Sequence, residues 1–81
     1  MKPVGKVTHY YDRLGVAIVE LADSLAVGDK IKIEKTDGNF FEQSVLSIHK
    51  NYEPAERAER GDVIGLKVVE PVTAGALVVL V

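Results

Sequence analysis

Two short segments of the sequence contain the side chains best suited to recognition chemistry. They lie at residues 10–13 and 49–52 and together hold Tyr10, Tyr11, Arg13, His49, Lys50 and Tyr52. Aromatic faces stack on unpaired bases and cations contact phosphates, so such a cluster could hold single-stranded RNA or the end of a tRNA. The alternative is that Tyr11 and Tyr52 close the ends of a barrel while the charged residues serve solubility.

The overall charge limits what such a cluster can bind. Ten lysines and arginines stand against twelve acids, which gives a net charge of −2. Residues 1–35 carry six cations and five acids, whereas residues 36–81 carry four and seven. A modest basic patch is compatible with these counts and a strongly basic face is not. Any RNA binding should therefore be weak, with a shallow salt dependence.

Residue types that carry catalysis are present without the spacing that catalysis needs. His9 and His49 are forty residues apart with no paired His or Cys spacing around either, and the chain has no cysteine, so no metal site is predicted. Ser24, Ser44 and Ser47 lack a nucleophile-elbow context. Glu53, Glu56 and Glu59 alternate with arginines in a stretch that is typical of a solvated turn. The sequence predicts no catalytic residue, no cofactor, no nucleotide hydrolysis and no peptidase activity.

Length and composition indicate one small globular domain over residues 1–81. Hydrophobic residues make up 47% and charged residues 27% of the chain, which excludes a disordered segment. The N-terminus lacks the apolar run of a signal peptide. The longest apolar stretch, residues 74–81, is too short to span a bilayer. The expected location is the cytoplasm, with no membrane partner.

The elements that must position the cluster are β-strands. Apolar and polar residues alternate in short runs between turn signals, near residues 4–10, 16–21, 30–35, 39–49, 63–69 and 77–81. Asp37-Gly38 is the strongest hairpin signal. A β-bulge is expected between Val45 and Ile48 because alternation breaks there, and residues 54–60 could form one helical turn. The predicted fold is all-β: a small closed antiparallel β-barrel of about six strands, because closure removes bare edges.

The last strand is apolar on both predicted faces. If Leu77, Val79 and Val81 face the core, Val78 and Leu80 point outward. Apolar side chains at such positions suggest cover by a second copy, by a partner or by a loop. The sequence therefore predicts weak self-association, which Val78→Lys or Leu80→Lys should reduce.

The order of motifs resembles domain II of translational GTPases such as elongation factor Tu. The segments that carry the resemblance are Gly5-Lys6-Val7, Gly15-Val16-Ala17-Ile18, residues 25–33, residues 41–48 and residues 58–66. Short stand-alone elongation-factor-like proteins and the C-terminal barrel of collagenase-like peptidases are similar too. The resemblance implies a closed antiparallel barrel that contacts RNA or a neighbouring domain.

The sequence departs from that family in two places. It has no phosphate-binding loop, since the only Gly-Lys pair is Gly5-Lys6, followed by Val7. At the last turn the family commonly has Gly-Asp, where this chain has Gly75-Ala76. The leading interpretation is a non-catalytic, translation-associated binding module that contacts RNA, the ribosome or a GTPase. The alternative is a protein-interaction module that docks a collagenase-like peptidase or another enzyme.

Overall fold

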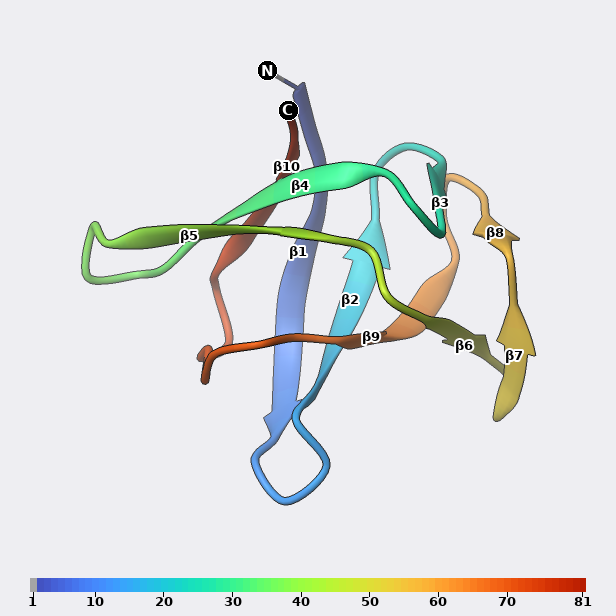
Figure 1. Cartoon of the computed structure of the whole chain (residues 1–81), viewed down its shortest axis with the longest axis horizontal. Helices are drawn as coiled ribbons and strands as arrows, with labels where there is room; N and C mark the ends of the chain where they lie inside the picture. The colour runs from blue at the N-terminus through green and yellow to red at the C-terminus, as the bar shows by residue number, and fades with distance from the viewer. Residues whose placement is uncertain (1) are drawn as a thin grey trace.

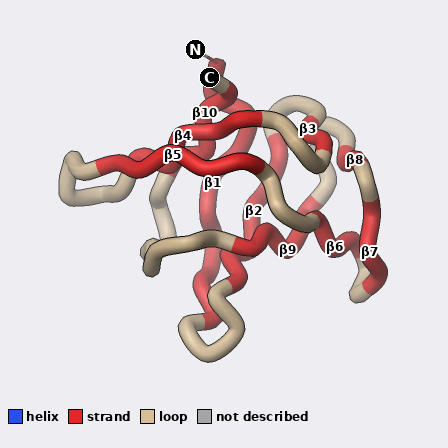
Figure 2. Tube along the Cα trace, viewed as in Figure 1, coloured by secondary structure: helices blue, strands red, loops and turns tan. Residues whose placement is uncertain are grey.

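The computed structural model describes residues 2–81, and these residues form strands and loops without any helix (Figures 1 and 2). The all-β prediction is confirmed. No helix within the described part of the chain is available to cross a membrane. The ten strands are β1 (Lys2–Tyr11), β2 (Val16–Leu21), β3 (Leu25–Ala26), β4 (Lys30–Glu34), β5 (Phe40–Ser44), β6 (Ile48–Lys50), β7 (Glu53–Ala55), β8 (Arg57–Ala58), β9 (Val63–Lys67) and β10 (Leu77–Leu80).

Eight strands form one curved antiparallel sheet in the order β5-β4-β10-β1-β2-β9-β6-β7, and β3 pairs with β8 in a small second sheet. The first and last strands, β1 and β10, pair with each other. The sheet is an open half-barrel whose outermost strands are β5 and β7 (Figure 1). The prediction of a closed barrel of about six strands is therefore wrong in its strand number and in its closure.

The difference arises in the middle of the chain. The strand expected over residues 39–49 is two strands, because residues 45–47 leave the sheet between β5 and β6. A full interruption thus replaces the expected bulge between Val45 and Ile48. The connector that could have held a helical turn forms β7 and β8 instead. These short strands place a hairpin, β6–β7, at one end of the sheet.

Register shifts in β1 change which side chains reach the core. The ladder with β10 shifts between Pro3 and Gly5, and the ladder with β2 shifts between Val7 and His9. Val4 and Val7, three residues apart, are both buried as a result. A strict alternation through residues 4–10 cannot give this pattern.

The orientation predicted for the last strand is wrong except at Val79, which is buried as expected. Val78 is fully buried in the core, and Leu80 is half-buried against it. Leu77 and Val81 are the exposed residues of this segment. Val78→Lys would therefore bury a charge in the core, and it cannot test a surface contact. Self-association stays a prediction.

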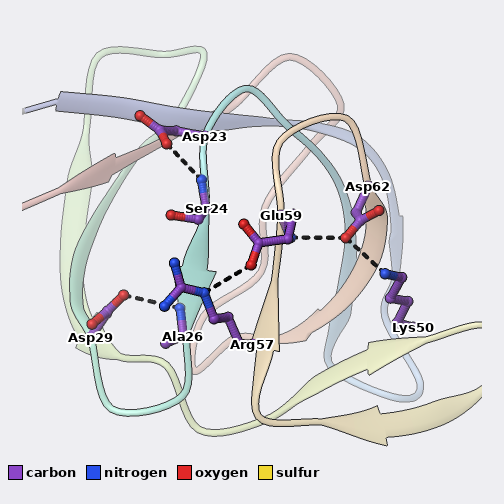
Figure 3. A network of polar contacts seen from close by, with 8 residues as sticks. All are labelled: Asp23, Ser24, Ala26, Asp29, Lys50, Arg57, Glu59 and Asp62. Carbon is purple, nitrogen blue, oxygen red and sulfur yellow. Dashed lines mark hydrogen bonds and ion pairs between the residues drawn. The ribbon is translucent and has the colours of Figure 1, made fainter.

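One turn occurs twice, at Gly28-Asp29 and at Gly61-Asp62 (Figure 3). Asp29 accepts a hydrogen bond from the backbone N–H of Ala26 at 3.0 Å, and Asp62 accepts one from Glu59 at 2.8 Å. These turns flank the pairing of β3 with β8. At the third position, Gly75-Ala76, the alanine is fully buried. A carboxylate there would be desolvated, which accounts for the departure from Gly-Asp.

The amide of Gln43 connects β5 to the chain that follows β9. Gln43 is 8% exposed and is the one buried polar side chain in residues 2–81. Its Nε2 donates to the carbonyl of Lys67 at 2.8 Å, and its Oε1 accepts from the N–H of Val69 at 2.9 Å. A side chain thus supplies the two bonds that a neighbouring strand would make, and it holds the open side of the half-barrel.

Candidate functional site

The β6–β7 hairpin reverses through two residues whose backbone lies in the left-handed region. Asn51 has φ of 54° and Tyr52 has φ of 64°, whereas the other residues with positive φ in residues 2–81 are glycines. Asparagine tolerates this conformation, but an aromatic residue is strained in it. The tyrosine side chain is fully exposed, at 102%. Neither burial nor packing accounts for a tyrosine at this position.

The β1–β2 turn presents a second group of apolar side chains. Gly15, with φ of 65°, donates its N–H to the carbonyl of Tyr11 at 2.9 Å and so closes the turn. Tyr11 and Leu14 are held outward there, 47% and 61% exposed. The ring of His9 lies edge-on to that of Tyr11 with centroids 4.5 Å apart.

The outer face of β2, β9 and β6 lies between these two turns and forms the floor of a groove. Ile18 pairs with Gly65, which in turn pairs with His49. A Cβ atom on Gly65 would lie 3.3 Å from Val16 Cγ1 and 3.7 Å from His49 Cβ. Because glycine has no side chain, the groove is deeper at this point. The groove has a volume of about 560 Å³ and is lined by Tyr11, Leu14, Val16, Ile18, Ser47, His49, Asn51, Tyr52, Val63, Ile64, Gly65 and Lys67.

Lys67 is the cation of this lining, and the β1–β2 turn fixes its position. Its Nζ donates to the carbonyl of Leu14 at 2.6 Å. A Cβ on Gly15 would lie 3.1 Å from that Nζ, so the glycine leaves room for the ammonium group. The backbone also joins the two elements, because the N–H of Val68 donates to the carbonyl of Gly15 at 2.9 Å. The ammonium group is therefore anchored at the rim.

The six residues predicted from sequence divide into two groups. Tyr11, His49 and Tyr52 lie in one groove although they are far apart in the sequence. Tyr10 is half-buried against the core, which leaves less of its side chain exposed than that of Tyr11. Arg13 is exposed in the β1–β2 turn, outside the lining. Lys50 is half-buried and pairs with Asp62 at 3.0 Å.

The sequence-based prediction did not include the residues of the groove floor or Lys67, the cation beside them. Every second residue of β9 lies on the outer face of the sheet, namely Val63, Gly65 and Lys67. The side chain of Val63 is 56% exposed. An apolar residue and a glycine on the outward face of a strand are the signal that could have shown it. That signal has meaning only once β2 and β6 are known to flank β9.

The two histidines share one cross-strand row. His9 pairs with Ile18, and Gly65 separates Ile18 from His49. With about 4.8 Å between neighbouring strands, their backbones are about 14 Å apart. Within residues 2–81 no group of three or more histidines or acids is placed to hold a metal ion. The geometry offers apolar and aromatic contact with one fixed cation.

The chain is similar to parts of larger proteins. No protein-family model matches it. It is 32% identical over 77 residues to an uncharacterized protease of Methanocaldococcus jannaschii; the match covers 95% of this chain and 19% of that protein. The chain therefore spans about a fifth of the curated relative.

Two crystal structures share the fold over almost the whole chain. Both are of the C-terminal domain of a Geobacillus thermoleovorans protein described as a U32 peptidase, one of them a selenomethionine variant. Each has a TM-score of 0.91 and 18% identity, with 98% or 99% of this chain and 99% or 92% of the other covered. Of the predicted resemblances, these matches support the C-terminal barrel of a peptidase. They do not support an identity with domain II of elongation factor Tu.

Proposed function

We propose that this domain is a non-catalytic module of a peptidase, and that its groove binds a polypeptide segment handled by the enzyme. The groove between Tyr11 and Tyr52 is the observation that carries the proposal. A strained backbone persists only where surrounding structure holds it, and such residues concentrate at functional sites. Here the strain presents an exposed tyrosine at the rim of an apolar groove.

The lining favours polypeptide over RNA as the occupant. Most of the lining is aliphatic or aromatic, and Lys67 is its one lysine or arginine. Single-stranded RNA needs a cationic groove that follows the phosphates, and Tyr10, a residue expected to stack, packs against the core. The related chains bear the names of a protease and a peptidase. A cytoplasmic location is part of the same proposal.

The position of the groove also suits a module of a longer protein. Lys2 pairs with Leu80, so both chain ends lie at one end of β1, and Tyr11 lies at the other end (Figure 1). A covalent connection to further domains through either chain end would leave the groove open. The catalytic chemistry would belong to the part of the enzyme outside this stretch.

Titration with a reduced, alkylated and therefore unfolded protein tests the proposal. We expect chemical-shift changes at the groove, weaker binding by Tyr11→Ala and no change by Phe40→Ala, a more exposed aromatic residue on β5. Gly65→Val should fill the floor and also weaken binding. If the unfolded protein does not bind, or if Phe40→Ala alone weakens it, the groove is not a polypeptide site.

A further inference from the structure

The charges of the groove differ from those of the rest of the chain. The sequence contains twelve Asp and Glu residues, yet within residues 2–81 none of them lines the groove, which has Lys67 and His49 instead. Asp62, which precedes Val63 in the sequence, is paired with Lys50. The surface is thus apolar with an uncompensated cation at its rim, in a protein whose net charge is negative.

Lys67 is held in a geometry suited to an anionic ligand. One N–H of its ammonium group is used by the carbonyl of Leu14, which leaves two donors for a ligand. Anchoring reduces the side-chain entropy that a flexible lysine would lose on binding. The neighbouring side chains are Val16, its cross-strand partner, and Leu14. A carboxylate bound here would lie beside apolar surface.

The floor itself offers few main-chain partners. At the centre of the floor, Gly65 pairs with Ile18 of β2 on one side and with His49 of β6 on the other, so its backbone groups already form ladder hydrogen bonds. A ligand cannot add as another strand at this point. Recognition there comes from side-chain contacts and from the charge at the rim.

We infer that the groove selects polypeptide segments in which an acidic side chain lies next to apolar ones, with the carboxylate on Lys67 and the apolar side chains between Tyr11 and Tyr52. This inference rests on the proposed function. It adds the chemical class of the ligand and assigns a specificity role to Lys67, which the sequence analysis did not single out.

An array of short overlapping peptides from one unfolded protein tests the inference. Each peptide is synthesised twice, once as it is and once with Asp and Glu replaced by Asn and Gln. We expect the acidic version of a bound apolar peptide to bind about fivefold more tightly, as for a partly exposed ion pair. Lys67→Met should remove that difference, Lys67→Arg should retain it, and Lys30→Met, on β4, should leave it unchanged.

The outcomes separate the two proposals. Equal binding of both versions would overturn the inference and leave the polypeptide groove intact. Binding of neither version at any position would overturn the proposed function. Binding of single-stranded RNA in a parallel titration, lost in Lys67→Met and without binding to any peptide of the array, would replace polypeptide by nucleic acid. Dimerisation of the wild type that Lys67→Met abolishes in light scattering would identify a second copy as the occupant and overturn the inference.

Discussion

The chain reverses direction in a hairpin at both ends of the eight-stranded sheet, but the two hairpins differ in backbone conformation. The β4–β5 hairpin turns through Asp37-Gly38, with the positive φ of 93° on glycine and the Asp37 carboxylate accepting the N–H of Asn39 at 2.9 Å. The β6–β7 hairpin turns through Asn51-Tyr52, with the positive φ on both residues. Asp37-Gly38 therefore suits the backbone of its turn. Asn51-Tyr52 leaves its turn strained and exposes a tyrosine.

The surroundings of the two ends differ in the same way. The β5 end is tied to residues 67–69 by the amide of Gln43. The β7 end borders the groove and exposes its residues to solvent. One end of the sheet therefore serves mainly stability, and the other presents a surface. The first three predictions below each act on one end and leave the other as a control, and the fourth acts on both ends.

Gln43→Leu should have the largest effect on stability. Leucine fills a similar volume but leaves the Lys67 carbonyl and the Val69 N–H without partners, and such losses cost about 2 kcal/mol. Chemical denaturation measures this loss. Gln43→Glu is the control for the bonds: it should destabilise at neutral pH and recover in acid, where a protonated carboxyl can donate again. If Gln43→Leu lowers the free energy of unfolding by less than about 0.5 kcal/mol, the amide does not hold the open side of the half-barrel.

Gly38→Ala should destabilise the β5 end by about 1 kcal/mol, because alanine is strained at positive φ. A Cβ atom at Gly38 would meet nothing within 4 Å, so the loss is conformational and not steric. Thermal unfolding followed by circular dichroism measures the shift. Polypeptide binding should be unchanged, since the turn lies outside the groove lining. A stability equal to wild type would mean that strain at such turns is negligible in this fold.

Tyr52→Gly should change stability in the opposite direction and make the protein more stable. Glycine relieves about 1 kcal/mol of left-handed strain, and its greater freedom in the unfolded chain offsets part of that gain. We expect a net stabilisation of about 0.5 kcal/mol, which for a domain of this size raises Tm by about 2–4 °C. Calorimetry measures it, with Tyr11→Ala as the control that leaves the backbone strain in place. A clear fall in Tm would mean that the exposed ring contributes to stability.

Acid should weaken both ends, with the smallest effect of the four. The backbone N–H of Asn39 lowers the pKa of Asp37, and the N–H of Glu59 with the Lys50 ammonium group lowers the pKa of Asp62. Because both pKa values fall on folding, the stabilisation is complete above the unfolded value near 3.9. It is lost as the pH falls through the folded values.

Denaturation between pH 7 and pH 2 measures this dependence. Asp37→Asn and Asp62→Asn should each make stability fall less steeply in acid, because an amide does not titrate. An unchanged slope in both variants would assign the acid sensitivity to other carboxylates.

Local sequence determines much of this fold. Alternation and Asp37-Gly38 predict most of the strands and the β4–β5 hairpin, because each signal depends on neighbouring residues. Other features depend on contacts between distant segments. These are the register shifts in β1, the interruption at residues 45–47 and the hydrogen bonds of Gln43 across the open side of the half-barrel. The all-β class was therefore predictable, whereas the open half-barrel and the facing of Val78 were not.

The residues of the candidate site were also predictable only in part. Tyr11, His49 and Tyr52 were predicted from their chemical types and proved to share one groove. Tyr10 was predicted to belong to the binding cluster because it is an aromatic residue beside Tyr11 and Arg13, yet it packs against the core. Lys67 could not be recognised before β9 was placed beside β2 and the β1–β2 turn.

Binding of unfolded polypeptide by Tyr52→Gly tests the central claim most directly, because stability and binding should change in opposite directions. Titration of wild type, Tyr52→Gly and Gly38→Ala with the same reduced, alkylated protein compares the two hairpins in one experiment. We expect Tyr52→Gly to be at least as stable as wild type and to bind severalfold more weakly, and Gly38→Ala to be less stable and to bind normally. Wild-type affinity in Tyr52→Gly would contradict the claim that the strained hairpin exists to present this tyrosine.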